Sequence, residues 1–198
     1  MSAQTDRFVH DRLPAPDHSP TCTYDSPELQ FPARLNLVEE LLDRAEARGF
    51  GNRPFLRSRT LTLTYNEARE RVDTVMRVLT QELGLVPGNR VLLRGGNSIG
   101  MALAWLAVVK AGMIAVATMP LLRARELGDI IDKAQPAAAL CEVKLLDELE
   151  LARLERPVLR TVVAFGGGDE KAFLPGPGAA PLPACPTAAD DIALLAFT

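Results

Sequence analysis

Residues 90–125, RVLLRGGNSIGMALAWLAVVKAGMIAVATMPLLRAR, contain the pattern that decides the fold. An apolar stretch at Val91–Leu93 leads through a turn of small and polar residues into an apolar helix predicted over residues 98–111. Gly112 ends this helix, and a second apolar stretch follows at Ile114–Met119. Both stretches lack polar alternation, which is typical of strands that are covered on both faces of a parallel sheet. The pattern therefore predicts a βαβ unit.

The same alternation continues towards the C-terminus. Helices are predicted over residues 126–134 and 145–154, and apolar strands over residues 137–143 and 158–165. Strands that alternate with helices favour an α/β fold. We expect a doubly wound, mostly parallel sheet with helices on both faces, forming part of a larger N-terminal domain.

Two further segments complete this half of the chain. Residues 166–188 are rich in Gly, Pro and Ala, so they are predicted to form a long surface loop. Residues 192–197 are predicted to form a final buried strand, which runs directly to Thr198. Because a domain rarely ends on a buried strand, we expect the chain to be a segment of a longer polypeptide.

The N-terminal region has a different character. Residues 1–34 contain five prolines and few periodic apolar positions, so we expect an extended Pro-rich arm. Residues 35–198 are assigned to the α/β portion. The arm contains both histidines, His10 and His18. A catalytic triad or a metal site would need partner residues held rigidly near them, and the sequence indicates none. We therefore assign them surface roles and predict no metal site.

Between the arm and the central unit, two capping boxes and a hairpin are predicted. Asn36 and Glu39 have capping-box spacing at the start of a predicted amphipathic helix, which Gly49 and Gly51 end. Residues 53–64 alternate around a polar turn, which indicates a β-hairpin with one solvated face. Thr64 and Glu67 form a fuller capping box and open a second helix.

Composition excludes several classes of function. The net charge of −3 gives no electrostatic reason to expect nucleic acid or an anionic membrane as a partner. No apolar run reaches the roughly 20 residues that span a bilayer, and the N-terminus lacks a signal-peptide core. Cys22, Cys141 and Cys185 are too few and too far apart for a disulfide framework or a zinc site. A reduced, cytoplasmic protein is the simplest expectation.

The turn Arg94–Gly100, RGGNSIG, lies between a strand and a helix, where phosphate-binding loops occur. It matches neither the dinucleotide fingerprint nor the lysine-bearing phosphate loop. We favour a tight turn with Ser98 as the helix N-cap, and a nucleotide-binding Rossmann domain remains the alternative. No complete catalytic motif occurs before Thr198, so no catalytic residue is assigned.

The order of several short motifs resembles the N-terminal part of AMP-forming acyl-CoA synthetases, which are adenylate-forming ligases. The similarity covers about residues 34–198 and rests on residues 63–67 (LTYNE), 84–91 (GLVPGNRV), 97–98 (NS), 107–112 (AVVKAG), 119–122 (MPLL), 126–127 (EL) and 192–198 (IALLAFT). Within the family, residues 115–127 look most like ligases of the benzoate and 2-aminobenzoate type.

The resemblance implies a two-step reaction on an aromatic carboxylate. ATP with Mg²⁺ would give an acyl-adenylate, and coenzyme A would then displace AMP. Thr198 would be the first residue of the loop that holds the ATP phosphates. Leu121 stands where some relatives carry an arginine that meets a phosphate of coenzyme A. Arg123 or Arg125 is a candidate for that role, and a solvated charge at the start of a helix is the alternative.

Two hypotheses follow from these observations. The leading one is that the chain is the N-terminal segment of an aryl-CoA ligase, inactive by itself, whose parent enzyme is a homodimer. The alternative is a complete, non-catalytic α/β binding or assembly module.

Overall fold

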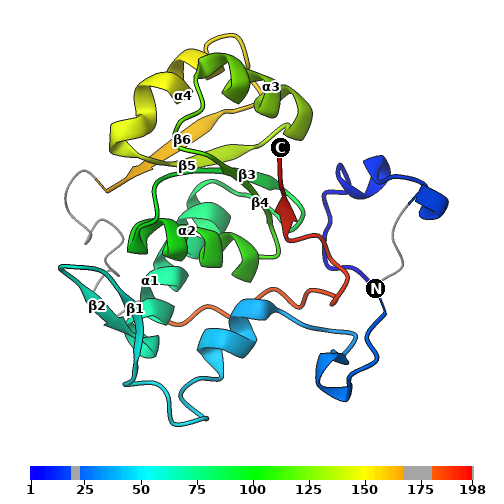
Figure 1. Cartoon of the computed structure of the whole chain (residues 1–198), viewed down its shortest axis with the longest axis vertical. Helices are drawn as coiled ribbons and strands as arrows, with labels where there is room; N and C mark the ends of the chain where they lie inside the picture. Colours follow the sequence, from blue (N-terminus) through cyan, green and yellow to red (C-terminus); the bar gives the residue numbers. More distant parts are fainter. Residues whose placement is uncertain (19–22, 167–179, 198) are drawn as a thin grey trace.

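The computed structural model describes residues 1–18, 23–166 and 180–197. Its centre is a parallel five-stranded sheet with the strand order β6-β5-β3-β4-β7 (Figure 1). These strands are β3 (Arg90–Arg94), β4 (Ile114–Thr118), β5 (Ala138–Glu142), β6 (Thr161–Phe165) and β7 (Leu194–Leu195). The predicted α/β class with a parallel sheet is confirmed.

The βαβ unit predicted from residues 90–125 is present. Helix α2 (Ile99–Lys110) joins β3 to β4, and the two strands pair in parallel along their whole length. All five residues of β3 are buried, as the missing polar alternation indicated. The Ser98 hydroxyl accepts a hydrogen bond from the Met101 N–H at 3.2 Å, which confirms Ser98 as the N-cap of α2.

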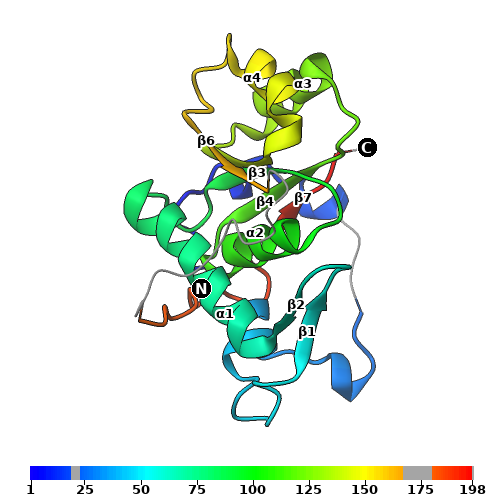
Figure 2. The same cartoon turned by 90° about the vertical axis from the view of Figure 1, so that its left-hand side faces the viewer.

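Helices cover both faces of the sheet (Figures 1 and 2). Helices α1 (Tyr65–Arg77) and α2 lie on one face, and α3 (Ala124–Ala134) and α4 (Leu146–Arg153) lie on the other. Alternate residues of β3 enter the two cores, because successive side chains of a strand point to opposite faces. Leu93 belongs to the core beside α1 and α2, whereas Leu92 belongs to the core beside α3 and α4. The sheet is therefore doubly wound.

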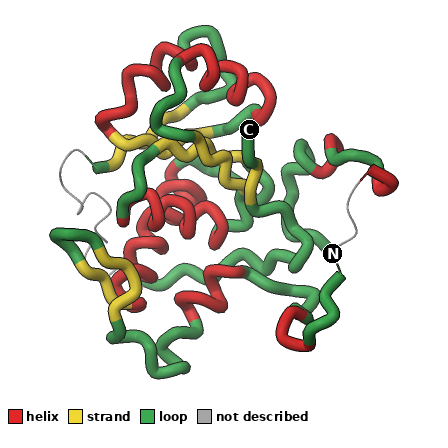
Figure 3. The backbone as a smooth tube through the Cα atoms, viewed as in Figure 1, coloured by secondary structure: helices red, strands yellow, loops and turns green. Residues whose placement is uncertain are grey.

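A hairpin precedes α1 and is drawn apart from the main sheet in Figure 3. Strands β1 (Pro54–Arg57) and β2 (Thr62–Thr64) pair antiparallel, as predicted. The Glu67 carboxylate accepts from the Thr64 N–H at 2.7 Å, and the Thr64 hydroxyl accepts from the Glu67 N–H at 3.3 Å. The predicted capping box therefore fixes the junction between the hairpin and α1.

Asn36 does more than the sequence indicated. Its Oδ1 accepts from the Val38 N–H at 3.0 Å, so it caps the following turn. The helix predicted up to Gly49 is wrong in length, because the chain forms a short π-helical segment at Glu39–Asp43 and then only turns. Asn36 is 3% exposed, and its Nδ2 donates to the carbonyl oxygens of Lys110 at 3.1 Å and Cys185 at 3.0 Å. The side chain thus ties the end of α2 to a distant segment.

Two predictions near the C-terminus need correction. Residues 167–179 of the expected surface loop lie outside the described residues, but Thr187 and Ala188 are buried. The surface-loop prediction is wrong there because the chain packs along the end of α2, where the Cys185 N–H donates to the Lys110 carbonyl at 2.9 Å. The final strand is also shorter than predicted. β7 is two residues long and pairs only with β4, which leaves Leu194 on the sheet edge 45% exposed.

The expected arm is only partly extended. Residues 3–12 lie against the amino edge of the sheet, with Val9 buried and a 3₁₀ turn at His10–Arg12. The apolar side chains farther along the arm, those of Leu13, Tyr24, Leu29 and Phe31, are exposed. In the described ranges, no helix is long and apolar enough to cross a membrane.

Candidate functional site

The carboxyl edge of the sheet has the topology of a binding crevice. The connection after β3 passes over one face of the sheet through α2, and the connection after β4 passes over the other face through α3. In open α/β sheets, ligands bind outside the carboxyl ends of neighbouring strands whose connections diverge in this way. The residues that follow β3, β4 and β5 therefore form the candidate site.

Arg94, the last residue of β3, organises this edge. The residue is only 1% exposed. Its Nε donates to the Leu145 carbonyl at 3.2 Å, and its Nη1 donates to the Met119 carbonyl at 3.0 Å. Its Nη2 donates to the carbonyl oxygens of Pro120 at 3.2 Å and Leu122 at 2.8 Å. One guanidinium thus fixes the chain after β4 against the chain after β5.

Burial lowers the pKa of Arg94 from its ordinary value, because the protein around it solvates the charge less well than water does. The hydrogen bonds occupy its donors but leave its unit charge in place. Arg94 therefore contributes a positive field to the edge, although it offers few donors for a ligand.

A pocket of about 330 Å³ opens beside Arg94. Its walls combine apolar side chains with charges of both signs. The lining residues are Arg94, Pro120, Leu121, Leu122, Arg123, Lys144, Leu145, Asp147 and Glu148. A pocket with apolar walls and a few charged groups is typical of small-molecule sites.

Arg123, the residue predicted to meet a coenzyme A phosphate, lines this pocket. Its side chain is 76% exposed, and its Nη1 forms an ion pair with Glu148 Oε1 at 2.9 Å. The other Glu148 oxygen accepts from the Ala124 N–H at 2.8 Å. This hydrogen bond and then the Arg123 charge hold the pKa of Glu148 below its ordinary value. Arg125, the second candidate, is exposed one residue inside α3 and is not among the residues lining the pocket.

The turn after β3 is occupied by a side chain of the protein itself. The Gly96 N–H donates to Glu142 Oε2 at 2.9 Å, and Lys144 Nζ lies 2.9 Å from Glu142 Oε1. Burial disfavours the charged form of Glu142, but these two contacts outweigh burial and lower its pKa. A carboxylate thus takes the place that a phosphate would need, which counts against a Rossmann-type nucleotide loop at this turn.

The remaining candidates lie elsewhere. Thr198 and Cys22 are outside the described residues. His18 is exposed, and His10 Nε2 lies 2.9 Å from Gln4 Oε1 in the arm. Cys141 and Cys185 are free thiols, and burial raises the pKa of Cys141 to about 11. In the part of the chain that the structure describes, no group of three or more His, Cys, Asp or Glu residues could hold a metal ion.

Sequence reasoning missed Arg94 and Glu142 as organisers of the edge. Each is the last residue of a buried strand, and each is a charged residue after an apolar run. That position is a usable signal, because parallel strands end together at the carboxyl edge. The contacts of these residues depend on the strand order, which the sequence does not specify.

Comparisons with known proteins agree with this fold. A model of the AMP-binding enzyme family matches residues 43–198. The benzoate–CoA ligase of Thauera aromatica is 28% identical over 181 residues, which cover 90% of this chain and 34% of that protein.

Two solved structures are similar as well. The anthranilate CoA ligase AuaEII, in complex with anthranoyl-AMP, gives a TM-score of 0.74 at 23% identity, covering 85% of this chain and 32% of that one. ATP-bound MatB from Rhodopseudomonas palustris gives a TM-score of 0.67 at 25% identity, covering 80% and 31%. The chain spans about a third of the length of these relatives. With most of its residues matched by the family model, the chain belongs to the AMP-binding enzyme family.

Proposed function

We propose that this chain supplies the N-terminal portion of an AMP-forming aryl-CoA ligase. Its parent enzyme joins an aromatic carboxylate, such as benzoate or 2-aminobenzoate, to the α-phosphate of ATP and releases pyrophosphate. The thiol of coenzyme A then attacks the acyl-adenylate, forms a thioester and releases AMP. The family match over residues 43–198 carries this proposal, and the similarity to a benzoate–CoA ligase supports the aromatic substrate.

In this proposal, the carboxyl edge is the side of the domain that faces the nucleotide. β7 runs parallel to β4, so the chain leaves β7 at this edge, and Thr198 begins the phosphate loop. The buried charge of Arg94 raises the local concentration of anions there. In this proposal Mg²⁺ enters with the ATP phosphates, which are its usual partners at nucleotide sites.

Arg123 is the proposed contact for a phosphate of coenzyme A. It lines the pocket and is mostly exposed, so a phosphate can compete with Glu148 for its guanidinium. Arg125 is the matched control because it lies two residues away and outside the pocket lining.

A chimera tests the proposal. In the Thauera aromatica benzoate–CoA ligase, residues 1–198 of this chain would replace the matching N-terminal third. Benzoate-dependent pyrophosphate exchange by the chimera is expected, together with none by the 198-residue chain alone. A chimera that has the circular dichroism spectrum of a folded ligase but releases no AMP would contradict the proposal and favour the non-catalytic module. Exchange by the isolated chain would refute its predicted inactivity.

Two further measurements test the role of Arg123 and the choice of an aromatic substrate separately. In an active chimera, Arg123→Ala should raise KM for coenzyme A about three- to tenfold, the effect of losing one partly exposed ionic contact, and Arg125→Ala should not. An equal effect of both variants would remove Arg123 from the site. In the complete natural polypeptide, AMP release should be faster with benzoate and 2-aminobenzoate than with octanoate, and the reverse order would overturn the aromatic assignment.

A further inference from the structure

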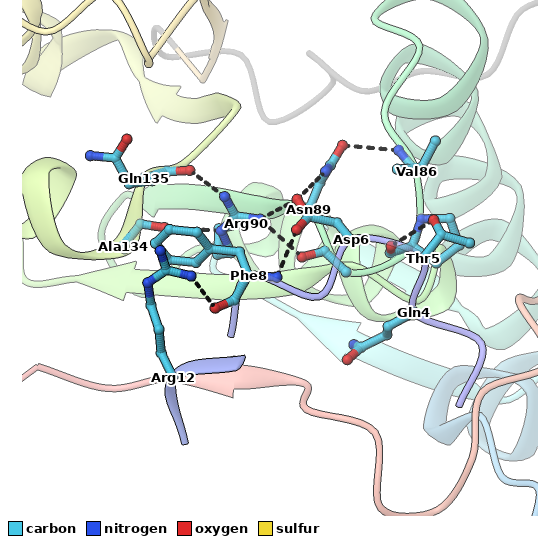
Figure 4. Close-up of polar contacts among 12 residues, drawn as sticks. Gln4, Thr5, Asp6, Phe8, Arg12, Val86, Asn89, Arg90, Ala134 and Gln135 are labelled. Atoms are coloured by element: carbon cyan, nitrogen blue, oxygen red, sulfur yellow. Dashed lines mark hydrogen bonds and ion pairs between the residues drawn. The ribbon is translucent and has the colours of Figure 1, made fainter. Parts of the chain in front are cut away.

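The N-terminal arm is anchored to the amino edge of the sheet by a dense set of polar contacts (Figure 4). The Thr5 and Asp6 N–H groups both donate to the Pro87 carbonyl at 3.0 Å. The Asp6 carboxylate accepts from Asn89 Nδ2 at 2.7 Å and forms an ion pair with Arg90. The approach is close, since a Cβ at Gly88 would lie 2.2 Å from the Asp6 carbonyl oxygen.

Gln4 reaches from the arm to the segment that leads into β7. The residue is 5% exposed, and its Nε2 donates to the carbonyl oxygens of Ile192 at 2.7 Å and Gly112 at 3.2 Å. Its Oε1 lies 2.9 Å from His10 Nε2. One buried amide therefore connects the arm, the turn before β4 and the segment that leads into β7.

Asp191 provides a second connection at the same place. Its Oδ2 accepts from the Ala3 N–H of the arm at 3.1 Å and from the Ala188 N–H at 2.9 Å. Burial favours the neutral form of Asp191, but hydrogen bonds from Ser2 and from these two amides outweigh it and lower its pKa. The charged carboxylate thus holds both the arm and the approach to β7.

β7 has a short backbone pairing, although Leu195 also packs against the core beside α3 and α4. It is two residues long, lies at the sheet edge and has β4 as its neighbour in the sheet. The Ala115 N–H adds one hydrogen bond to the Ala193 carbonyl at 2.9 Å. A strand of this length falls below the usual range and needs external support to keep its register.

From these contacts we propose that residues 3–10 of the arm position β7, and that Gln4 and Asp191 are the positioning residues. Because β7 runs from the amino edge to the carboxyl edge, a shift of its start would also shift the residues that follow it. In the proposed function the phosphate loop begins there, so this last step rests on the proposed function. Residues 3–10 lie outside the segment matched by the family model, which begins at residue 43.

Hydrogen exchange on the 198-residue chain tests the positioning role without any assay of activity. Gln4→Met keeps the length of the side chain but leaves the Ile192 and Gly112 carbonyls without their donor. Amides of residues 193–197 should exchange about tenfold faster, because one buried hydrogen bond is worth roughly 1–2 kcal/mol, while amides of β5 keep their rates. Thr5→Val is the matched control, since the Thr5 hydroxyl donates to the Pro87 carbonyl in an exposed hydrogen bond.

Unchanged exchange at residues 193–197, or an equal increase throughout the sheet, would overturn the proposal. Removing residues 1–12 and supplying them as a separate peptide gives a second test. The peptide should restore slow exchange at residues 193–197, and a peptide with Gln4→Met should not. Equal restoration by both peptides would also overturn the proposal.

The step to the nucleotide is tested in the benzoate–CoA ligase chimera. Gln4→Met should raise KM for ATP about tenfold and leave KM for benzoate unchanged, because only the phosphate side is displaced. Equal changes in both constants would refute this step. An inactive chimera with the native arm would count against the proposed function, whereas the exchange experiment would still decide the role of the arm.

Discussion

Strand β3 carries a buried arginine at each end, and the two are neutralised differently. Arg90, at the amino edge, donates to the carbonyl oxygens of Ala134 at 2.9 Å and Gln135 at 2.8 Å. It also forms an ion pair with Asp6, and its guanidinium lies 4.3 Å from the centre of the Phe8 ring. Arg94, at the carboxyl edge, binds four carbonyl oxygens. In the described ranges, no carboxylate lies within ion-pair distance of it.

The difference assigns separate roles to the two edges. The arm pairs the charge of Arg90 with the Asp6 carboxylate, although a pocket of about 330 Å³ lined by both residues still opens at the amino edge. The unit charge of Arg94 is not cancelled, since carbonyl dipoles solvate a cation without neutralising it. The same residue type is thus paired with a carboxylate at one edge and with backbone carbonyl oxygens at the other.

Arg94→Met gives the largest expected effect on this comparison. It removes the donors from four partly buried carbonyl oxygens. The free energy of unfolding should fall by about 3 to 5 kcal/mol in urea denaturation. Arg94→Lys is the control, because it keeps the charge but loses the planar guanidinium that reaches several carbonyl oxygens at once. It should recover less than half of the lost free energy of unfolding. Near-native stability of Arg94→Met would show that loop carbonyls do not need this guanidinium.

Asp6→Asn should have a smaller effect at the opposite edge. It leaves Arg90 buried without its counter-ion but with its carbonyl partners, so we expect a loss of about 1 to 2 kcal/mol at pH 7. Asp11→Asn is the matched control on the same arm, because the Arg7–Asp11 pair is largely exposed. If both variants lower the free energy of unfolding equally, Asp6 does not act as the counter-ion of Arg90.

The pH dependence sharpens the same contrast. Burial of Asp6 favours its neutral form, but hydrogen bonds from the Phe8 N–H, Arg90 and Asn89 outweigh burial and lower its pKa below the ordinary 3.8. The unfolded chain therefore binds this proton at a higher pH than the folded chain does, so the contribution to stability is complete above the ordinary pKa and is lost as pH falls below it. Between pH 5 and pH 2, the native chain should lose more stability than Asp6→Asn. Parallel curves would contradict this assignment.

The smallest expected effect is that of Arg123→Ala at the rim of the pocket. An exposed ion pair with Glu148 contributes little to folding, so the free energy of unfolding should change by about 0.5 kcal/mol or less. Thermal and urea denaturation can measure this limit. A larger loss would show that Arg123 holds the edge together, as Arg94 does, and is not free for a ligand.

Local patterns in the sequence predicted the central framework well. The apolar runs of β3 and β4, the Ser98 cap and the Thr64–Glu67 capping box depend on residues within a few positions of one another. Their interactions form inside a single turn or strand, so spacing alone indicates them. The α/β class followed from the same short-range regularity.

Contacts between distant segments could not be read in this way. Gln4, Asn36 and Arg94 are polar residues that the folded chain buries by pairing them with backbone carbonyls far along the sequence. Backbone carbonyls occur at every position, so no sequence pattern marks the partners in advance. The role of Thr198 stays a prediction, and so do the boundaries of the arm and of the α/β portion.

The bond between Ala3 and Asp191 joins residues that are 188 positions apart. At 5 to 20 residues per second, a ribosome needs roughly 10 to 40 s to deliver the second partner after the first. During that interval the arm can dock on residues 87–90, but it lacks its partners at Asp191 and Ile192. The contacts of Ala3 and Gln4 with residues 191 and 192 are therefore the last of the arm's contacts to form, and cleavage within residues 3–12 should report how long each new molecule waits for them.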